Sequence, residues 1–180
     1  FCGNAGLRPT TGRYPTGGVV PISHSRDTAG PMARSVADLR LLDSVLADRN
    51  VAPYAPPNLS NIRIGVPRAH FFNALDGSVA KGIEATLERL KSYGITLVNA
   101  DIPDVDVVHK AGNFPVLLYE AVVDLNAYLA ANDTGLDFRA VVAELGSPDV
   151  RQVLEPLLSG GGIEESVYRE ALTVHRPRLQ

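Results

Sequence analysis

The spacing of hydrophobic positions changes twice over the first third of the chain. Residues 1–34 carry only short apolar pieces among Gly, Pro, Thr and Arg residues, which predicts extended segments and tight loops. From Ser35 onward, the apolar residues fall on one broad helical face, formed by Val36, Leu39, Leu42, Val45 and Leu46. Ser35 followed by Asp38 is a variant of the capping box and predicts a helix start. Residues 50–61 are rich in proline and lack periodicity, which predicts a connector.

Residues 62–100 show the pattern of a βαβ unit. A strand is predicted at 62–66, where Pro67 ends it, and a second strand at 95–98. Between them, residues 78–93 form an amphipathic pattern whose inward positions are Val79, Ile83, Leu87 and Leu90. Gly94 stands where a helix C-cap belongs. A strand, a helix and a strand in this order predict a right-handed crossover and a parallel pair.

The remaining residues, 101–180, are predicted to be mostly helical. Residues 115–131 are apolar round most of the helical circumference, so we expect this helix to be well buried. Three shorter helices are predicted at 138–145, 149–158 and 164–175, and Pro156 interrupts the pattern of the middle one. Taken together, these patterns indicate an α/β fold.

Composition narrows the class of protein. A chain of 180 residues can bury a sizeable single core, and its hydrophobic share of 45% is typical of globular proteins. A formal net charge of −3 gives no basic surface for nucleic acid or for an anionic membrane. No uninterrupted apolar run reaches the roughly 18–20 residues of a membrane span. The single cysteine excludes an internal disulfide and fits a reducing compartment, so we expect a cytoplasmic protein.

Local catalytic motifs are few. We find no nucleophile elbow, phosphate loop, zinc-type His-Glu-x-x-His or dinucleotide fingerprint in the sequence. The four histidines share no ligand spacing, so no metal site is expected. Cys2 lies beside a glycine and an aromatic residue, and we interpret it as a small buried apolar residue rather than a nucleophile.

The acidic residues have plain interpretations. Asp101, Asp104 and Asp106 follow a predicted strand and are interpreted as a solvated turn rather than as an acid/base pair. Glu120 and Asp124 stand four residues apart on a predicted helix, where they share one face. We interpret them as polar partners across an interface rather than as catalytic groups.

The loop at residues 23–28, Ser-His-Ser-Arg-Asp-Thr, is unusually polar and is followed by a Gly-Pro turn. Its backbone and side chains must find hydrogen-bond partners somewhere in the fold. His24 between two serines suggests acyl-transfer chemistry, but side chains adjacent in sequence point in different directions. We therefore favour an ordinary histidine that lies at the surface or pins the loop. Propensity and pattern alone lead to an α/β domain of unknown purpose.

An ordered series of residues in the first quarter of the chain resembles the amidase signature family. The series comprises Phe1-Cys2-Gly3, Gly6-Leu7-Arg8-Pro9-Thr10, Gly12-Arg13, Gly18-Val19-Val20-Pro21, Ser25-Arg26-Asp27-Thr28, Gly30-Pro31, Arg34, Val36, Asp38 and Leu41-Leu42. Ile64-Gly65-Val66-Pro67 followed by His70-Phe71-Phe72 resembles the next landmark of the family. Later residues look most similar to the branch that includes mandelamide and indoleacetamide hydrolases, namely Glu120, Tyr128-Leu129, Tyr168 and Arg176-Pro177.

The resemblance implies a fold and a place within it. The chain would form the central portion of a single amidase domain with a mixed sheet flanked by helices, truncated at both ends. Within this domain, residues 1–49 would be the core segment that follows the nucleophile loop. Residues 50–61 would be a connector, and residues 62–100 would form the βαβ unit. Residues 101–180 would be a mostly helical wall of the substrate pocket. In isolation, we expect such a piece to aggregate or to stay partly molten.

The implied chemistry is hydrolysis of the C–N bond of small, aryl-substituted primary amides to an acid and ammonia. In this family a Lys, a Ser in a cis peptide and a nucleophilic Ser form the triad, without a cofactor. All three are expected upstream of Phe1, so no catalytic residue is assigned in this chain, and the chain alone is expected to be inactive. Ser25, Arg26, Asp27 and Thr28 are the candidates for supporting the nucleophile loop or for lining the substrate pocket.

Two alternatives stay open. One is the glutaminase component of a tRNA-dependent amidotransferase, and the other is a non-catalytic α/β binding module. The expected partner is a small-molecule amide substrate. The sequence leaves a homodimer open and predicts neither a nucleic acid nor a membrane as partner.

Overall fold

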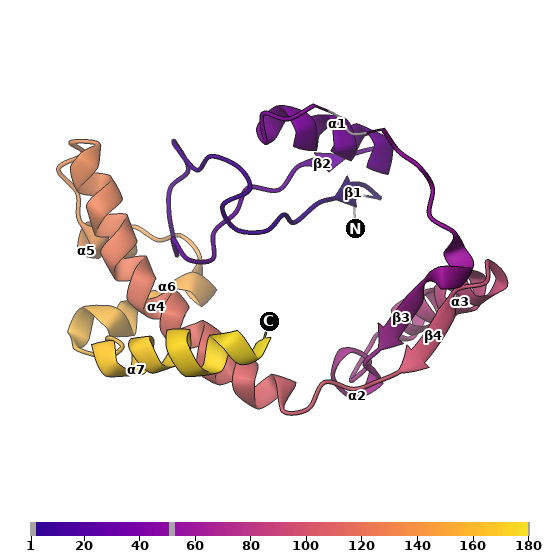
Figure 1. Cartoon of the computed structure of the whole chain (residues 1–180). Helices are drawn as coiled ribbons and strands as arrows, with labels where there is room; N and C mark the ends of the chain where they lie inside the picture. Colours follow the sequence, from indigo (N-terminus) through magenta and orange to yellow (C-terminus); the bar gives the residue numbers. More distant parts are fainter. Residues whose placement is uncertain (1–2, 51–52, 180) are drawn as a thin grey trace. The chain divides into compact units, whose positions relative to one another are not determined.

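The computed structural model describes residues 3–50 and 53–179, which pack into two compact units (Figure 1). The first unit combines the described N-terminal residues up to Asn50 with Lys110–Arg178, and the second consists of Pro53–His109 together with Leu179. Cys2, interpreted above as a buried apolar residue, lies outside the described residues.

The N-terminal part of the first unit is built from extended segments and tight loops, as its sequence predicts. β1 (Ala5–Gly6) pairs with β2 (Met32–Ala33) in antiparallel register. Gly30 lies directly against this pair, since a Cβ at this position would stand 2.5 Å from the carbonyl oxygen of Leu7. The close approach of two backbones therefore requires glycine here.

α1 (Val36–Leu46) begins where the capping pattern places it. The Ser35 hydroxyl accepts a hydrogen bond from the backbone N–H of Asp38 at 3.2 Å and donates to the Asp38 carboxylate at 2.8 Å. Ser35 thereby satisfies a backbone donor that has no partner within the helix, so the predicted N-cap is confirmed.

An ion pair joins α1 to the loop that precedes it. Arg13 donates from Nε and Nη2 to the two carboxylate oxygens of Asp43, at 2.6 and 2.5 Å. The hydroxyl of Tyr14, a residue 5% exposed, donates to the same carboxylate at 2.7 Å. The hydrogen bonds from Arg13 and then Tyr14 lower the pKa of Asp43 to about 2.

α4 (Val105–Ala131) starts ten residues before the predicted helix at 115–131 and carries Pro115 in its interior. The expectation that this helix would be well buried holds for only one of its faces. Val116 is fully buried, yet Val123 is 51% exposed and Phe114 is also exposed. The described first unit therefore covers one face of α4 and leaves the opposite face open.

The length and composition of α4 are those of a helix that could cross a membrane, although no uninterrupted apolar run in it is that long. The core helix of a soluble protein has the same properties. Glu120 in the middle of α4 is buried among hydrogen-bond donors of its own unit. Such a partnered carboxylate favours the core-helix interpretation.

The shorter helices follow α4 in the order expected, with differences at two prolines. They are α5 (Phe138–Ala143), α6 (Pro148–Leu154), the 3₁₀ helix η2 (Glu155–Ser159), α7 (Glu165–Glu170), the π-helix η3 (Ala171–His175) and the 3₁₀ helix η4 (Arg176–Leu179). The helix predicted at 149–158 changes type at Glu155, directly before Pro156. The last helix changes twice, and its 3₁₀ end contains Pro177. Proline has no N–H for the α-helical bond to the residue four positions earlier, which accounts for the 3₁₀ geometry at Pro156 and at Pro177.

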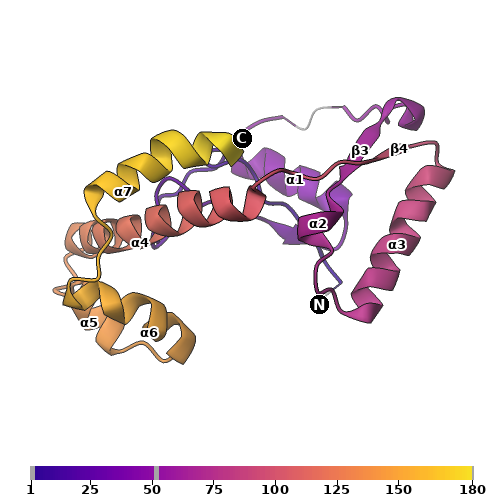
Figure 2. The ribbon, with the colours of Figure 1, turned by 90° about the horizontal axis from the view of Figure 1, so that it is seen from below.

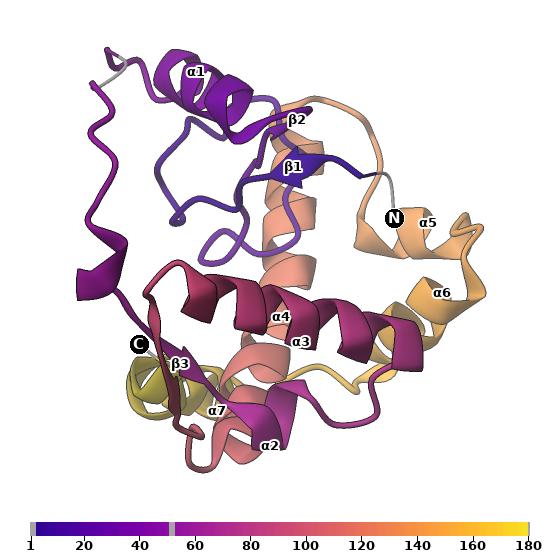
Figure 3. The same cartoon turned by 90° about the vertical axis from the view of Figure 1, so that its right-hand side faces the viewer.

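The second unit confirms the predicted βαβ pattern (Figure 3). β3 (Arg63–Val66) and β4 (Thr96–Asn99) are parallel, with Arg63 opposite Thr96. Between them lies α3 (Gly77–Ser92), whose end is marked by Gly94 at φ +88°. The 3₁₀ helix η1 (Leu59–Asn61) precedes β3, and the short α2 (Arg68–Phe71) follows it.

The face of α3 is less buried than predicted. Ile83, Leu87 and Leu90 are half-buried, whereas Val79 is 48% exposed, so its assignment to the inward face is wrong. The helix packs on a sheet of only two strands, which is too narrow to cover its first turn within the second unit.

The acidic residues after β4 are not all in a turn. Asp106 lies in the first turn of α4, where its carboxylate pairs with Nδ1 of His70 at 2.6 Å. Asp101 accepts a hydrogen bond from the backbone N–H of Ala69 at 2.8 Å. Asp106 is solvated as predicted, with a side chain 77% exposed, but it lies in a helix and not in a turn, because the helix begins earlier than the apolar pattern indicates.

Candidate functional site

The carboxylate of Glu120 forms the centre of a polar cluster in the first unit. Glu120 is 1% exposed and projects from α4. Its Oε2 accepts hydrogen bonds from the hydroxyl of Ser23 at 2.6 Å, the hydroxyl of Ser25 at 2.9 Å and the backbone N–H of Ser25 at 3.2 Å. Its Oε1 accepts a hydrogen bond from the hydroxyl of Tyr168 at 2.8 Å. Three segments that lie far apart in the sequence thus meet at one buried side chain.

The hydrogen bonds decide the protonation state of Glu120. Burial raises the pKa of this carboxyl, but the donors Ser23, Tyr168 and Ser25 together outweigh that effect, so the pKa lies below its ordinary value. The same contact acts oppositely on Tyr168. Burial and then the hydrogen bond to Glu120 raise the pKa of Tyr168 to about 12. At neutral pH the cluster therefore contains a carboxylate and a neutral phenol.

α7 is held along α4 by an aromatic contact beside this carboxylate. The rings of Tyr119 and Tyr168 are stacked, with centroids 4.1 Å apart and planes inclined by 10°. Gly112 makes a second close approach, since a Cβ there would lie 3.3 Å from the backbone nitrogen of Arg176. Figure 2 shows the two helical segments running side by side over this length.

Arg176 completes the cluster through a serine hydroxyl. Its Nη1 donates to Oγ of Ser25 at 2.7 Å, and its Nη2 donates to the backbone carbonyl of Ser25. The Ser25 hydroxyl therefore accepts from a guanidinium and donates to the Glu120 carboxylate. An ion pair bridged by a hydroxyl in this way leaves Ser25 without a free base to activate it, so Ser25 does not have the environment of a nucleophile.

His24 pins the loop, as the sequence suggests. Its Nδ1 lies 2.9 Å from Oδ2 of Asp124, and its backbone N–H donates to the same oxygen at 2.6 Å. Because a carboxylate only accepts hydrogen bonds, Nδ1 carries the proton. Neither Ser23 nor Ser25 donates to the imidazole, since both hydroxyls donate to Glu120. The adjacent Ser-His-Ser residues thus do not form a catalytic triad.

One group of potential metal ligands lies within the described part of the chain, namely His24, Glu120 and Asp124. The hydrogen bonds around these residues do not suit a cation. The oxygens of Glu120 accept from four donors, and Asp124 holds both the ring and the backbone of His24. An ion would have to displace these donors. The arrangement fits a hydrogen-bond network better than a metal site.

Arg26 and Asp27 fix the shape of the loop. Oδ2 of Asp27 accepts from the backbone N–H groups of Ile22 at 2.7 Å and Ser23 at 2.9 Å. The guanidinium of Arg26 donates to the backbone carbonyl of Asn113, on α4, at 2.9 Å. Both charged groups are therefore occupied with the backbone of their own unit.

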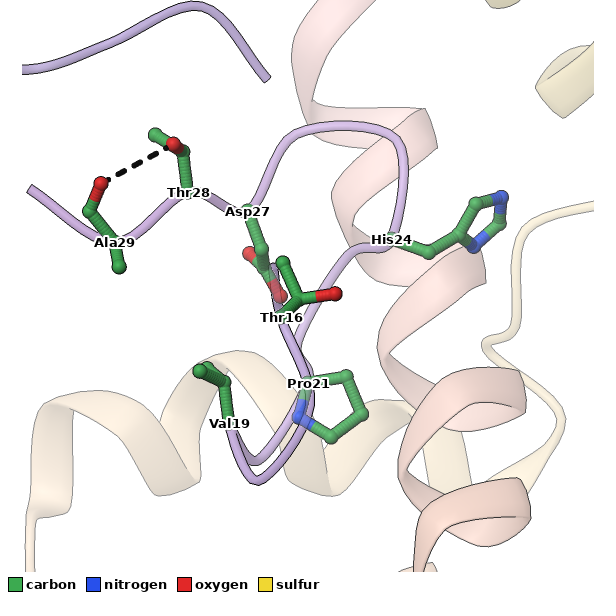
Figure 4. A pocket seen from close by; sticks show the side chains of 7 residues that line it. All are labelled: Thr16, Val19, Pro21, His24, Asp27, Thr28 and Ala29. Atoms are coloured by element: carbon green, nitrogen blue, oxygen red, sulfur yellow. Dashed lines mark hydrogen bonds between the residues drawn. The ribbon is translucent and has the colours of Figure 1, made fainter. Parts of the chain in front are cut away.

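A small cavity of about 110 Å³ lies on the other side of the loop (Figure 4). It is lined by Thr16, Val19, Pro21, His24, Asp27, Thr28 and Ala29. The Thr28 hydroxyl donates to the carbonyl of Ala29 at 3.3 Å and lies at the cavity wall. Sites for small organic ligands usually measure roughly 300–1,000 Å³, so this cavity is too small to hold an aryl amide by itself.

The four candidates from the sequence lie on one loop but have different surroundings; they are Ser25, Arg26, Asp27 and Thr28. Ser25 faces Glu120 and Arg176, and Arg26 reaches α4. Asp27 turns back onto the loop backbone, and Thr28 lies at the cavity. Glu120 and Asp124 are polar partners of this loop, as interpreted. The sequence did not indicate that Ser23 would be buried, because a serine in a polar loop carries no signal of burial.

Comparison with known proteins places the chain in a family. The amidase family model matches residues 1–178, which is nearly the entire chain. The chain belongs to the amidase family. An indoleacetamide hydrolase of Allorhizobium ampelinum is 42% identical over 180 residues, covering 100% of this chain and 38% of that protein. A mandelamide hydrolase of Pseudomonas putida is 37% identical over 186 residues, covering 98% of this chain and 36% of that protein.

The fold of the amidase chain is confirmed by a solved structure. A crystal structure of an amidase superimposes with a TM-score of 0.69 at 26% identity, covering 98% of this chain and 37% of that protein. The predicted α/β class is therefore correct, and the chain forms part of the amidase signature fold. The chain spans somewhat more than a third of the length of the curated relatives named above.

Proposed function

We propose that the full-length protein containing this sequence hydrolyses the C–N bond of small, aryl-substituted primary amides to an acid and ammonia. The observation that carries the proposal is the match along the whole chain to an indoleacetamide hydrolase, at 42% identity. A mandelamide hydrolase matches almost as well. Both relatives are named for an amide of an aryl-substituted acetic acid. The substrate partner of this protein would accordingly be a small amide.

The reaction would use a serine nucleophile, a second serine in a cis peptide and a neutral lysine, all outside residues 1–180. Lysine acts as a base only when its surroundings lower its pKa, and backbone N–H groups would stabilise the oxyanion of the acyl transfer. The described residues are consistent with this location. Ser23 and Ser25 are held by Glu120, and Lys91 pairs with Glu88. Such a mechanism needs no cofactor.

The Ser25–Thr28 segment would support the nucleophile-bearing loop. Its side chains bind backbone and carboxylate groups of the first unit, which favours a supporting role over contact with substrate. The protein as a whole would be cytoplasmic, because a sequence with a single cysteine has no internal disulfide framework.

Ammonia release by the full-length protein tests this function. We expect hydrolysis of indoleacetamide and mandelamide, with kcat/KM at least about tenfold above that for glutamine, because an apolar pocket discriminates strongly against a charged, zwitterionic amide. The 180-residue chain alone should release no ammonia. A preference for glutamine would favour the amidotransferase alternative, and no release from any amide would refute amide hydrolysis.

A further inference from the structure

The N-terminal loop is attached to the helical part of the first unit mainly at Glu120. Ser23 and Ser25 approach this carboxylate from the loop, and Tyr168 approaches it from α7. The bonds from the two serines span 97 and 95 residues of sequence. The loop has two further attachments to α4, the Asp124 contact of His24 and the Arg26 bond to Asn113. Glu120 is the only fully buried one of the three acceptor residues, since Asp124 and Asn113 are partly exposed.

A buried carboxylate is a costly way to hold two segments together. Removing such a group from water is unfavourable, and the hydrogen bonds and the nearby Arg176 recover that loss only when the geometry is good. An apolar side chain of similar size would often give equal or greater stability. What distinguishes a carboxylate is that its hydrogen bonds are directional, so the three donors from the loop fix where the loop backbone lies.

The loop conformation depends on the same contacts. The carbonyl of Ser23 accepts from the N–H groups of Arg26 at 2.9 Å and Asp27 at 2.7 Å, while Asp27 caps Ile22 and Ser23. The turn is therefore closed on itself and can shift only as one piece. The point at which Glu120 holds Ser23 and Ser25 therefore determines the position of the whole Ser23–Thr28 segment.

We propose that Glu120 is a positioning residue for amide hydrolysis, acting through the Ser23–Thr28 loop, with Arg176 holding Ser25 from the opposite side. The inference rests on the function proposed above. Glu120 does not touch the substrate or the reacting atoms. Its carboxylate instead fixes the loop that carries the supporting residues of the active site.

The decisive variant is Glu120→Gln in the full-length protein. Gln keeps the length and shape of the side chain, and Tyr168 can turn its hydroxyl to accept from the new amide group. The charge that the loop donors share is lost. We expect kcat for indoleacetamide to fall about 10- to 100-fold, because small misplacements of catalytic geometry have effects of this size, with KM changed less than about threefold. The pH profile should keep its shape, since Glu120 takes no part in proton transfer.

Two further variants keep the inference testable if Glu120→Gln folds poorly. Tyr168→Phe removes one donor but leaves the carboxylate, and should lower kcat by a smaller factor, about threefold. Glu165→Gln, which alters an exposed ion pair with Arg169 on the same C-terminal segment, is the matched control and should leave kcat unchanged. All assays are run at a temperature where circular dichroism shows each variant to be folded.

The outcomes separate the two proposals. An inactive wild-type protein would refute amide hydrolysis. An active wild type, together with a folded Glu120→Gln variant of unchanged kcat, would overturn only the positioning role. The loss of one ionisation from the pH profile of that variant would also overturn it, because Glu120 would then be an acid or a base. A fall in kcat at nearly constant KM, graded from Glu120→Gln to Tyr168→Phe, supports the inference.

Discussion

The contacts that stabilise the two units differ in their separation along the sequence, being local in the second unit and long-range in the first. In the second unit, the parallel strands β3 and β4 and the intervening α3 lie within forty residues of sequence. In the first unit, Glu120 accepts from a serine 97 residues away, and Arg176 reaches a serine 151 residues away. The chemistry differs as well, since the strands pair through regular backbone bonds and the cluster depends on single side chains.

This difference predicts how far the structural effect of a substitution should extend. Contacts between neighbouring residues close small loops at low entropic cost, so one lost bond is readily compensated by its neighbours. A contact that spans 97 or 151 residues orders a long stretch of chain and has few substitutes. Damage to the cluster should therefore loosen the whole first unit, whereas damage to the second unit should stay within it.

Glu120→Ala should give the largest effect. It removes the acceptor for the hydroxyl of Ser23, which is fully buried, and for those of Ser25 and Tyr168, which are partly buried. Each buried donor without a partner costs roughly 1–3 kcal/mol, so we expect the full-length protein to lose about 3 kcal/mol or more. Urea denaturation followed by circular dichroism measures the loss.

Hydrogen exchange of the Glu120→Ala variant locates the damage. Peptides covering Ser23–Thr28 and α7 should exchange faster, and those covering β3 and β4 should keep their wild-type rates. Glu84→Ala, which breaks an exposed ion pair with Arg68 in the second unit, is the control for loss of a charged side chain. Equal acceleration in both units would contradict the separation of the two.

Gly94→Ala tests whether the second unit depends on the local backbone conformation at the end of α3. Gly94 ends α3 at φ +88°, and an alanine there would be strained although no atom lies closer than 3.9 Å to its Cβ. We expect a loss of about 1–2 kcal/mol, because a left-handed backbone is unfavourable for residues with a Cβ.

Gly82→Ala is the matched control for Gly94→Ala. Gly82 lies within the same helix, and an added Cβ would meet nothing within 4 Å. Because alanine is the better helix former, this substitution should stabilise the protein by about 0.5–1 kcal/mol. Urea midpoints that move in the same direction for both variants would show that the backbone conformation at Gly94 is not the cause.

The same contrast explains which parts of the fold were predictable. The βαβ unit follows from the apolar spacing of 62–98 and from Gly94, and the start of α1 follows from Ser35 and Asp38, because each signal lies close to the element that it defines. The helix predicted at 115–131 is ten residues shorter at its start than α4, since Pro115 and the polar residues before it interrupt the apolar pattern. The burial expected for α4 is too high because periodicity shows which faces are apolar and not which of them are covered.

The site was predictable only in its parts. The sequence singles out the loop at 23–28 and Glu120 by their polar residues, and singles out Tyr168 and Arg176 through resemblance to a family. Their convergence around one carboxylate could not be derived, because hydrogen-bond partners 48–151 residues apart leave no local pattern. The functional roles of Ser25, Arg26, Asp27 and Thr28 stay predictions, since their contacts fix their positions and not their part in the reaction.

The smallest expected effect concerns acid stability at the Arg13–Asp43 pair. The guanidinium of Arg13 and the hydroxyl of Tyr14 hold the pKa of Asp43 at about 2, below its ordinary value of 3.8. A carboxyl with a lowered pKa in the folded state contributes stability that is complete above its unfolded pKa and is lost as the pH falls through its folded pKa. The difference in urea midpoint between the wild type and Asp43→Asn should therefore be constant from pH 7 to about pH 4, and should shrink between pH 4 and pH 2.

Because Glu120 also has a lowered pKa, the comparison is repeated in the Glu120→Gln background, where the acid dependence of Glu120 is absent. A difference in urea midpoint that stays unchanged down to pH 2 would show that α1 is held by the packing of Tyr14 and not by the charge of Asp43. The contact between α1 and the Arg13 loop would then depend on packing, as the second unit depends on local contacts.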